Sequence, residues 1–181
     1  MSLSDLYKRL KKQFPMGGLT EQRPDLGFVT LPAEHLRSLL ARLRDAEGFT
    51  HLVLLTAVDW LEEEQFQLTY LLSNRERGCD LGVRVMLERP ADGLASMESI
   101  HDLWPTAETY QRELREMFGI DFPGSPRVDE AFILEGWIDK PPYRRDFDTL
   151  KFAEENFRQR PGRETQDPAQ YMKQQRYPDA N

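Results

Sequence analysis

The chain has 181 residues, and its 31 Asp and Glu outnumber its 24 Lys and Arg, which gives a formal net charge of −7. This length suffices for one domain with a hydrophobic core, and the acidic balance argues against binding to a nucleic-acid backbone. The longest apolar run, residues 52–58, is interrupted by Thr56 and is far shorter than the roughly 20 residues that span a bilayer. Because the first residues also lack the apolar stretch of a secretory signal, we expect a cytoplasmic protein with no transmembrane helix.

Side chains that hold cofactors are scarce. The single cysteine, Cys79, cannot form an internal disulfide, and one thiol cannot hold an iron–sulfur cluster or a structural zinc ion. The three histidines have no Cys, Asp or Ser at motif spacing, and no glycine-rich phosphate-binding motif occurs. We therefore expect no cofactor and no metal in this chain, so that any redox cofactor would belong to a partner.

The first third of the chain alternates helix and strand signals. Residues 3–14 have apolar side chains at helical spacing before Pro15, and we expect this helix to dock on the core; the alternative is that its basic face lies on a membrane surface. Residues 26–31 predict a short strand between two prolines. A second helix is expected from Pro32 to its stop at Gly48.

Three strands are predicted next. The continuous apolar run of residues 52–55 is typical of a central strand covered on both faces, whereas residues 66–72 and 81–87 alternate apolar and polar side chains. A hairpin loop, residues 73–80, joins the last two strands. The acidic residues 62–64 are interpreted as a solvated turn. Together these elements predict an α+β fold, a two-layer domain with helices packed on a mixed β-sheet.

Residues 99–147 combine tryptophans, prolines and opposite charges, and their middle part predicts a helix over 107–118. Pro105 and Thr106 supply a start signal and Gly119 a stop. Glu113 lies at the edge of the apolar stripe of this helix. Because a partly buried carboxylate needs a cationic partner, we expect Glu113 to pair with Arg144 or Arg145.

The run WPTAETYQRELREMFGI, followed by a glycine-bearing loop and the segment PPYRRDF, resembles the complex I 30-kilodalton subunit family, which includes the C subunit of proton-pumping NADH:quinone oxidoreductase. The resemblance spans roughly residues 25–150. The motif residues that match are Arg112, Glu113, Glu116, Met117, Phe118 and Gly119. The chain departs from the motif at Gln111, Ser125 and Asp129, which leaves open the equivalent subunit of a membrane-bound energy-converting hydrogenase or formate hydrogenlyase.

The resemblance implies a cofactor-free peripheral-arm subunit that supports electron transfer from NADH to quinone and proton pumping. It further implies docking on the large quinone-site subunit and on a neighbouring iron–sulfur subunit, on the cytoplasmic side, with membrane association only through the complex. The expected partner contacts are Trp137, Pro142, Arg144, Arg145, Asp146 and Phe147. The alternative is that the segment with paired prolines packs back on its own domain.

We expect two parts: a globular α+β domain at residues 1–136, and an extended Pro-rich segment with a C-terminal arm for partner contacts at residues 137–181. From Asp148 onward apolar residues are too few to form a core. A function of another class, a stand-alone hydrolase that uses Glu113 and Glu116, is the remaining alternative. The neighbouring Arg112 and Arg115 disfavour it, because they would keep both carboxylates ionised.

Overall fold

The computed structural model describes residues 2–157. The chain forms two compact units, which meet in sequence at Phe147 and Asp148. In the first unit the elements are α1 (Leu3–Leu10), β1 (Thr20–Arg23), β2 (Leu26–Thr30), η1 (Ala33–His35), α2 (Leu36–Glu47), β3 (His51–Trp60), η2 (Leu61–Glu63), β4 (Gln65–Asn74), β5 (Cys79–Glu88), β6 (Ala95–Ser96), α3 (Ala107–Phe118) and β7 (Ile120–Asp121). In the described part of the second unit, α4 (Thr149–Asn156) is the helix.

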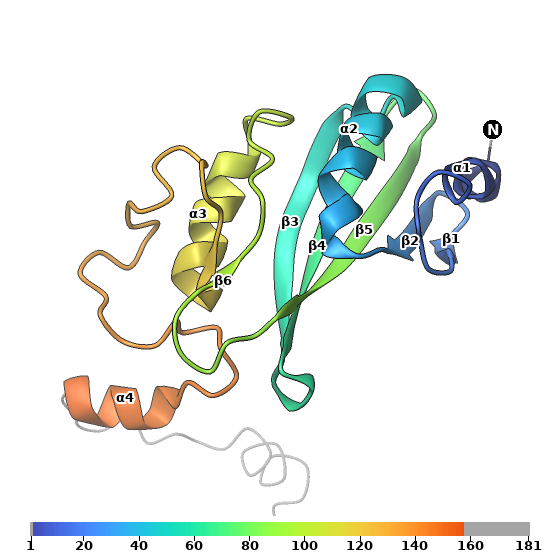
Figure 1. The fold of residues 1–181 in the computed structure, drawn as a ribbon. Helices are drawn as coiled ribbons and strands as arrows, with labels where there is room; N and C mark the ends of the chain where they lie inside the picture. Colours follow the sequence, from blue (N-terminus) through green and yellow to red (C-terminus); the bar gives the residue numbers. More distant parts are fainter. Residues whose placement is uncertain (1, 158–181) are drawn as a thin grey trace, which may run out of the picture. The chain divides into compact units, whose positions relative to one another are not determined.

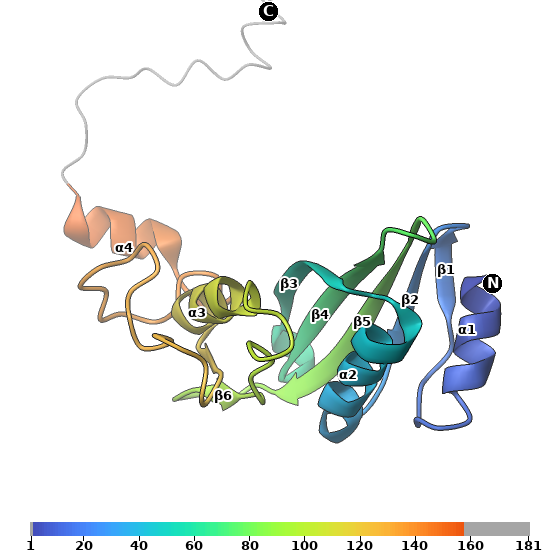
Figure 2. The ribbon, with the colours of Figure 1, turned by 90° about the horizontal axis from the view of Figure 1, so that it is seen from above.

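Five strands form one mixed sheet in the order β1-β2-β5-β4-β3 (Figure 1). β2 and β5 run parallel, whereas the other neighbouring strands run antiparallel. The buried leucines of α1 and α2 share one core with the inward side chains of the strands, and α2 lies against β4 and β5 in both views (Figure 2). The predicted fold class, an α+β domain with helices packed on a mixed sheet, is confirmed.

Local signals set the bounds of the helices. Ser2 and Asp5 form a capping box at the start of α1, with the Ser2 hydroxyl accepting the Asp5 backbone N–H at 3.1 Å. α2 ends at Gly48, whose φ of 78° is a left-handed conformation that glycine adopts without strain. Its four leucines at positions 36, 39, 40 and 43 are fully buried, and each contributes about 1.5–3 kcal/mol by leaving water.

α3 begins and ends at the predicted residues and is linked to the sheet at both ends. The Trp104 indole donates to the Thr50 carbonyl oxygen (3.0 Å), and the Tyr110 hydroxyl donates to the Val53 carbonyl oxygen (2.9 Å). At the other end, β7 pairs with β6, which follows β5. These contacts hold α3 beside β3 and place its C-terminal end near the loop after β5.

The structure corrects the prediction for the apolar run at residues 52–55. β3 is the last strand of the sheet rather than a central one, and a bulge between Leu52 and Leu54 turns Val53 and Leu54 toward solvent. The strand order depends on pairings between distant segments, which the local sequence of one strand does not specify. A covering element for this side of β3 is absent among the described residues.

The C-terminal region also differs from the expected extended arm. The side chain of Asp148 accepts the backbone N–H of Lys151 (2.9 Å) and thereby caps α4, so residues 149–156 are helical. The rest of the expected arm, residues 158–181, lies outside the described residues. The first unit extends to Phe147, so the Pro-rich segment 137–147 belongs to the same compact unit as the sheet.

Candidate partner-docking site

Glu116, on α3, fastens the loop that follows β7 to the helix. Its carboxylate accepts the backbone N–H groups of residues 132–134 at 2.7, 2.9 and 3.0 Å. Hydrogen bonds to an ionised acceptor are roughly twice as strong as bonds between neutral groups. Glu116 is therefore occupied in positioning this loop, and it is not poised to act as a general acid or base.

Arg112 and Arg115 contact the same loop from neighbouring turns of α3. The Nη2 atom of Arg115 lies 2.7 Å from the carboxylate of Asp129. Arg112 lies 3.9 Å from the carboxylate of Glu130, and its guanidinium stands over the Phe132 ring, 5.7 Å from the ring centre. The basic face of the helix is thus matched to an acidic loop.

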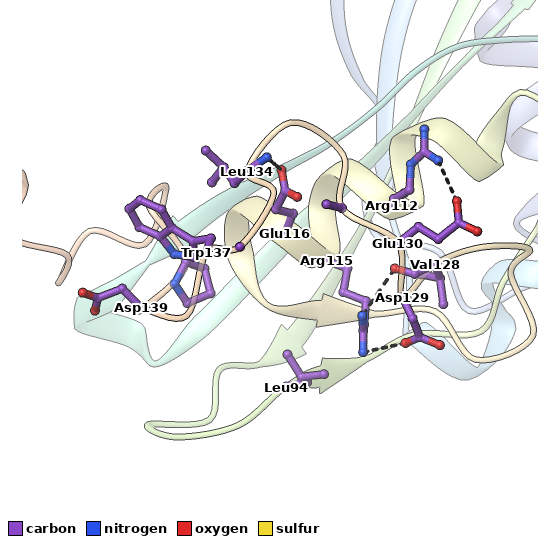
Figure 3. A pocket seen from close by; sticks show the side chains of 13 residues that line it. Leu94, Arg112, Arg115, Glu116, Val128, Asp129, Glu130, Leu134, Trp137 and Asp139 are labelled. Carbon is purple, nitrogen blue, oxygen red and sulfur yellow. Dashed lines mark hydrogen bonds and ion pairs between the residues drawn. The ribbon is translucent and has the colours of Figure 1, made fainter.

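A pocket of about 410 Å³ opens between α3 and this loop. Figure 3 shows the charged side chains of α3 paired with loop residues, with Leu94 and Trp137 also on its wall. Trp and Arg are enriched at the energetic centres of protein–protein contacts. The combination of an aromatic ring, apolar residues and paired charges is typical of a protein-contact surface.

Arg144 is buried, with 4% of its surface exposed. Its guanidinium donates to the carbonyl oxygens of Phe118 (2.8 Å), Gly93 (3.1 Å) and Pro90 (3.3 Å). Burial, followed by repulsion from the nearby Arg89, lowers the pKa of Arg144 from its ordinary value. Because one of these acceptors is the last carbonyl group of α3, Arg144 joins the end of the helix to the loop after β5.

Gly119 makes this arrangement possible. Its φ of 74° favours glycine, and a Cβ atom at this position would lie 3.0 Å from Nη2 of Arg144 and 3.2 Å from Cγ of Pro141. A side chain here would push the segment 137–147 away from the end of α3. Gly119 therefore both ends the helix and admits Arg144.

Asp59 and Arg89 form the centre of a second set of ionic contacts. Arg89 donates from Nε to Asp59 (2.6 Å) and from Nη2 to Asp146 (2.6 Å), and Asp146 also accepts from Lys140 (2.8 Å). Burial acts against ionisation of Asp146, but the hydrogen bonds from Lys140 and Arg89 hold its pKa below the ordinary value. This network attaches the segment 137–147 to the ends of β3 and β5.

Arg145 is the solvent-facing member of the arginine pair. Its backbone N–H donates to Asp59 (2.9 Å), while its half-exposed side chain donates to Glu62 (2.9 Å). Tyr143 and Ile138 in the same segment are 58% and 100% exposed. The outer surface of the segment therefore presents Ile138, Tyr143 and Arg145.

The predicted pairing of Glu113 with Arg144 or Arg145 is wrong. Arg144 is used by the three carbonyl oxygens, Arg145 by Glu62, and Glu113 has no ion pair or hydrogen bond with either among the residues that the structure describes. The physical reason is that the end of α3 leaves carbonyl groups unsatisfied, and these attract the arginine more closely than the half-buried Glu113 does.

The remaining predicted residues lie around the same segment. Met117 is buried, and its carbonyl oxygen accepts the Tyr143 N–H (2.9 Å). Phe118 packs edge-on against Tyr143, with ring centres 5.6 Å apart. Trp137 packs against Phe147 with ring centres 5.7 Å apart, and Pro142 is half-buried.

Sequence reasoning missed Asp59, Arg89 and Gln111. The alternation along β3 contains a signal for Asp59, because it has the same phase as the inward Leu55 and Ala57, and a buried carboxylate requires a cation. Gln111 is fully buried on α3 and accepts a hydrogen bond from the Ser99 hydroxyl (2.8 Å). No local signal identifies Arg89.

Within residues 2–157, no group of three or more His, Cys, Asp or Glu side chains is arranged to hold a metal ion. The same residues contain no helix that is both long and apolar enough to cross a membrane. The charged residues of the site are arranged in ion pairs that join loops to α3 and to the sheet, and this arrangement defines a scaffold and contact protein.

The chain belongs to the family of the respiratory-chain NADH dehydrogenase 30 Kd subunit, which it matches over residues 29–153. The C subunit of the NADH-quinone oxidoreductase of Moorella thermoacetica is 29% identical over 145 residues, covering 80% of this chain and 95% of that protein. The joined C/D subunit of the NADH-quinone oxidoreductase of Acidiphilium cryptum is 32% identical over 156 residues, covering 80% of this chain but 25% of that longer protein.

A solved structure shares the fold. A chain in the structure of the membrane-bound sulfane sulfur reductase, an archaeal respiratory membrane complex, superposes with a TM-score of 0.74 at 26% identity, covering 91% of this chain and 96% of that chain. The protein is therefore one subunit of a larger assembly of the complex I type. These comparisons do not favour the hydrolase alternative, and Glu116 is already bonded to three backbone groups.

Proposed function

We propose that the chain is a cofactor-free peripheral-arm subunit of an NADH:quinone oxidoreductase, where it positions its neighbours for electron transfer from NADH to quinone and for proton pumping. The family match over residues 29–153 carries this proposal. The contacts of Glu116, Arg144 and Asp59 support a role in binding rather than chemistry, because each holds protein segments together.

The proposed principal partner is the large quinone-site subunit, with a neighbouring iron–sulfur subunit beside it. A relative whose name joins the letters C and D, and whose matched part is a quarter of its length, supports close contact between the two proteins that these letters denote. We place the complex on the cytoplasmic side of the membrane, with this chain attached only through its partners.

The partner contact is proposed to use the outer surface of segment 137–147. An isoleucine that is fully exposed on an ordered loop, Ile138, gains by being covered, and Tyr143 and Arg145 next to it are residue types enriched at contact centres. Arg144 and Asp146 act from below, by holding the segment in place.

Deletion of the gene, followed by complementation, tests the proposed reaction. Membranes of the deletion strain should lose NADH-dependent quinone reduction, and the wild-type chain should restore it. Unchanged NADH:quinone reductase activity in the deletion strain, with the loss of another membrane activity, would contradict the proposal.

The second candidate is the equivalent subunit of a membrane-bound energy-converting hydrogenase or formate hydrogenlyase. The likeness to a chain of a sulfane sulfur reductase complex favours keeping this class, because that complex is respiratory and its name includes no NADH dehydrogenase. Loss of hydrogen-dependent activity in the deletion strain, with NADH:quinone reduction intact, would support this candidate instead.

A further inference from the structure

One face of the sheet carries exposed apolar side chains. Along β3 the inward residues alternate with Leu54, Val58 and Trp60, which point to the opposite face. Met86 of β5 lies on this same face, because Gln67 of β4 pairs with both Val58 and Met86. The four apolar side chains are 38% to 43% exposed.

The composition of β3 differs from that of its neighbour on this face. The outward positions of β4 near Trp60 are Gln65, Gln67 and Thr69, as expected for a strand that faces water. β3 instead has the apolar sequence of a strand covered on both faces, although the described residues cover only one of them. Exposed apolar patches with a polar rim mark sites of interaction.

Charge around the patch indicates what covers it. The turn after Trp60 contains three consecutive glutamates, at positions 62–64, and Glu88 lies in the same cross-strand row as Trp60. An acidic border in a chain with a net charge of −7 disfavours an anionic lipid surface and favours a partner with basic residues.

The patch also adjoins the proposed partner contact. Arg145 donates its backbone N–H to Asp59 and its side chain to Glu62, which lie on either side of Trp60 in the sequence. A neighbour that covers Tyr143 and Arg145 therefore lies close to the Trp60 end of the sheet face.

We propose that the open sheet face formed by Leu54, Val58, Trp60 and Met86 is a second docking surface. Its occupant is a segment of a neighbouring protein subunit that presents apolar side chains to the patch and Lys or Arg to residues 62–64. This inference rests on the proposed function, because it requires the chain to be assembled in a complex.

Photo-cross-linking in the assembled complex tests this surface. A photoreactive phenylalanine analogue would replace Val58 or Met86, with the exposed turn residue Glu76 as the control position, in a chromosomally tagged chain. Irradiation should join the first two variants, but not the control, to another subunit, within an apolar segment that contains Lys or Arg. Cross-links to a second copy of this chain or to lipid, or no cross-link in an intact complex, would overturn the proposal.

A charge substitution gives an independent measurement. Val58→Glu should leave the melting temperature of the isolated chain nearly unchanged, because this side chain points outward, yet reduce several-fold the amount retained in the complex. Gln22→Glu on β1 adds the same charge at the opposite edge of the sheet and should retain wild-type assembly. Equal retention of both variants would overturn the inference. Capture of the intact complex in that case would leave the proposed function standing, whereas failure of the wild-type chain to capture any partner would contradict both.

Discussion

Asp59 and Arg89 form an ion pair that is almost fully shielded from water, with Nε of Arg89 2.6 Å from the Asp59 carboxylate and side chains that are 1% and 5% exposed. Asp59 lies near the end of β3, Arg89 follows β5, and the pair also binds the backbone of Arg145 and the carboxylate of Asp146. The position of segment 137–147 therefore depends on a charge pair in the sheet.

Replacement of Asp59 should destabilise the fold strongly. Asp59→Ala leaves the buried Arg89 without its main partner, and the loss of one member of a buried pair costs about 3–5 kcal/mol. Glu62→Ala is the matched control, because Glu62 also pairs with an arginine but is solvent-exposed, and its melting temperature should stay near wild type. Similar melting temperatures for the two variants would show that the buried pair is not a main support.

Glu116 should matter more than Glu113 for stability, which reverses the expectation from the sequence. Glu116→Ala removes three charge-assisted hydrogen bonds, and we expect a loss of about 1–3 kcal/mol. Amide hydrogen exchange should accelerate at residues 132–134 in this variant. Glu113→Ala should behave like wild type in both measurements, and the opposite ranking would favour Glu113 as the structural carboxylate.

Arg144 and Arg145 should separate stability from assembly. Arg144→Met strands three carbonyl groups around an apolar side chain, which should cost at least about 1–3 kcal/mol and lower the melting temperature. Arg145→Ala should leave the melting temperature nearly unchanged and lower retention in the complex, because its side chain is exposed. Equal effects on both readouts would mean that the two arginines have the same role.

Asp146 should contribute to the acid limb of stability. Its pKa is lower in the folded chain than in the unfolded chain, so its contribution is present above the unfolded value of about 3.9 and is lost as the pH falls through the folded value. Urea unfolding between neutral pH and about pH 3 should therefore show a shallower loss of stability for Asp146→Asn than for wild type. Parallel curves would contradict a contribution from this carboxylate.

The sequence predicts elements well where the signals are local. Pro105, Thr106 and Gly119 lie next to α3, and its bounds agree with the prediction. β1 was missed because its four residues are polar and exposed, and α4 because the scarcity of apolar residues outweighed the cap at Asp148.

The site was predicted less well, because its contacts join distant segments. Arg144 and Arg145 were placed in the correct region, but the choice among Glu113, Asp59 and backbone carbonyl groups depends on how the loops fold over the end of α3. The edge position of β3 has the same cause, since one strand does not encode the order of its neighbours.

Assembly can be measured directly by capture of a chromosomally tagged chain from solubilised membranes, with quantification of the proteins that accompany it. We predict a stoichiometric large quinone-site subunit and an iron–sulfur subunit in the captured material, and loss of both when Ile138→Asp is combined with Tyr143→Ala in a chain that still melts at the wild-type temperature. Capture of the chain without these subunits, or unchanged capture by the double variant, would contradict the proposed role and its contact surface respectively.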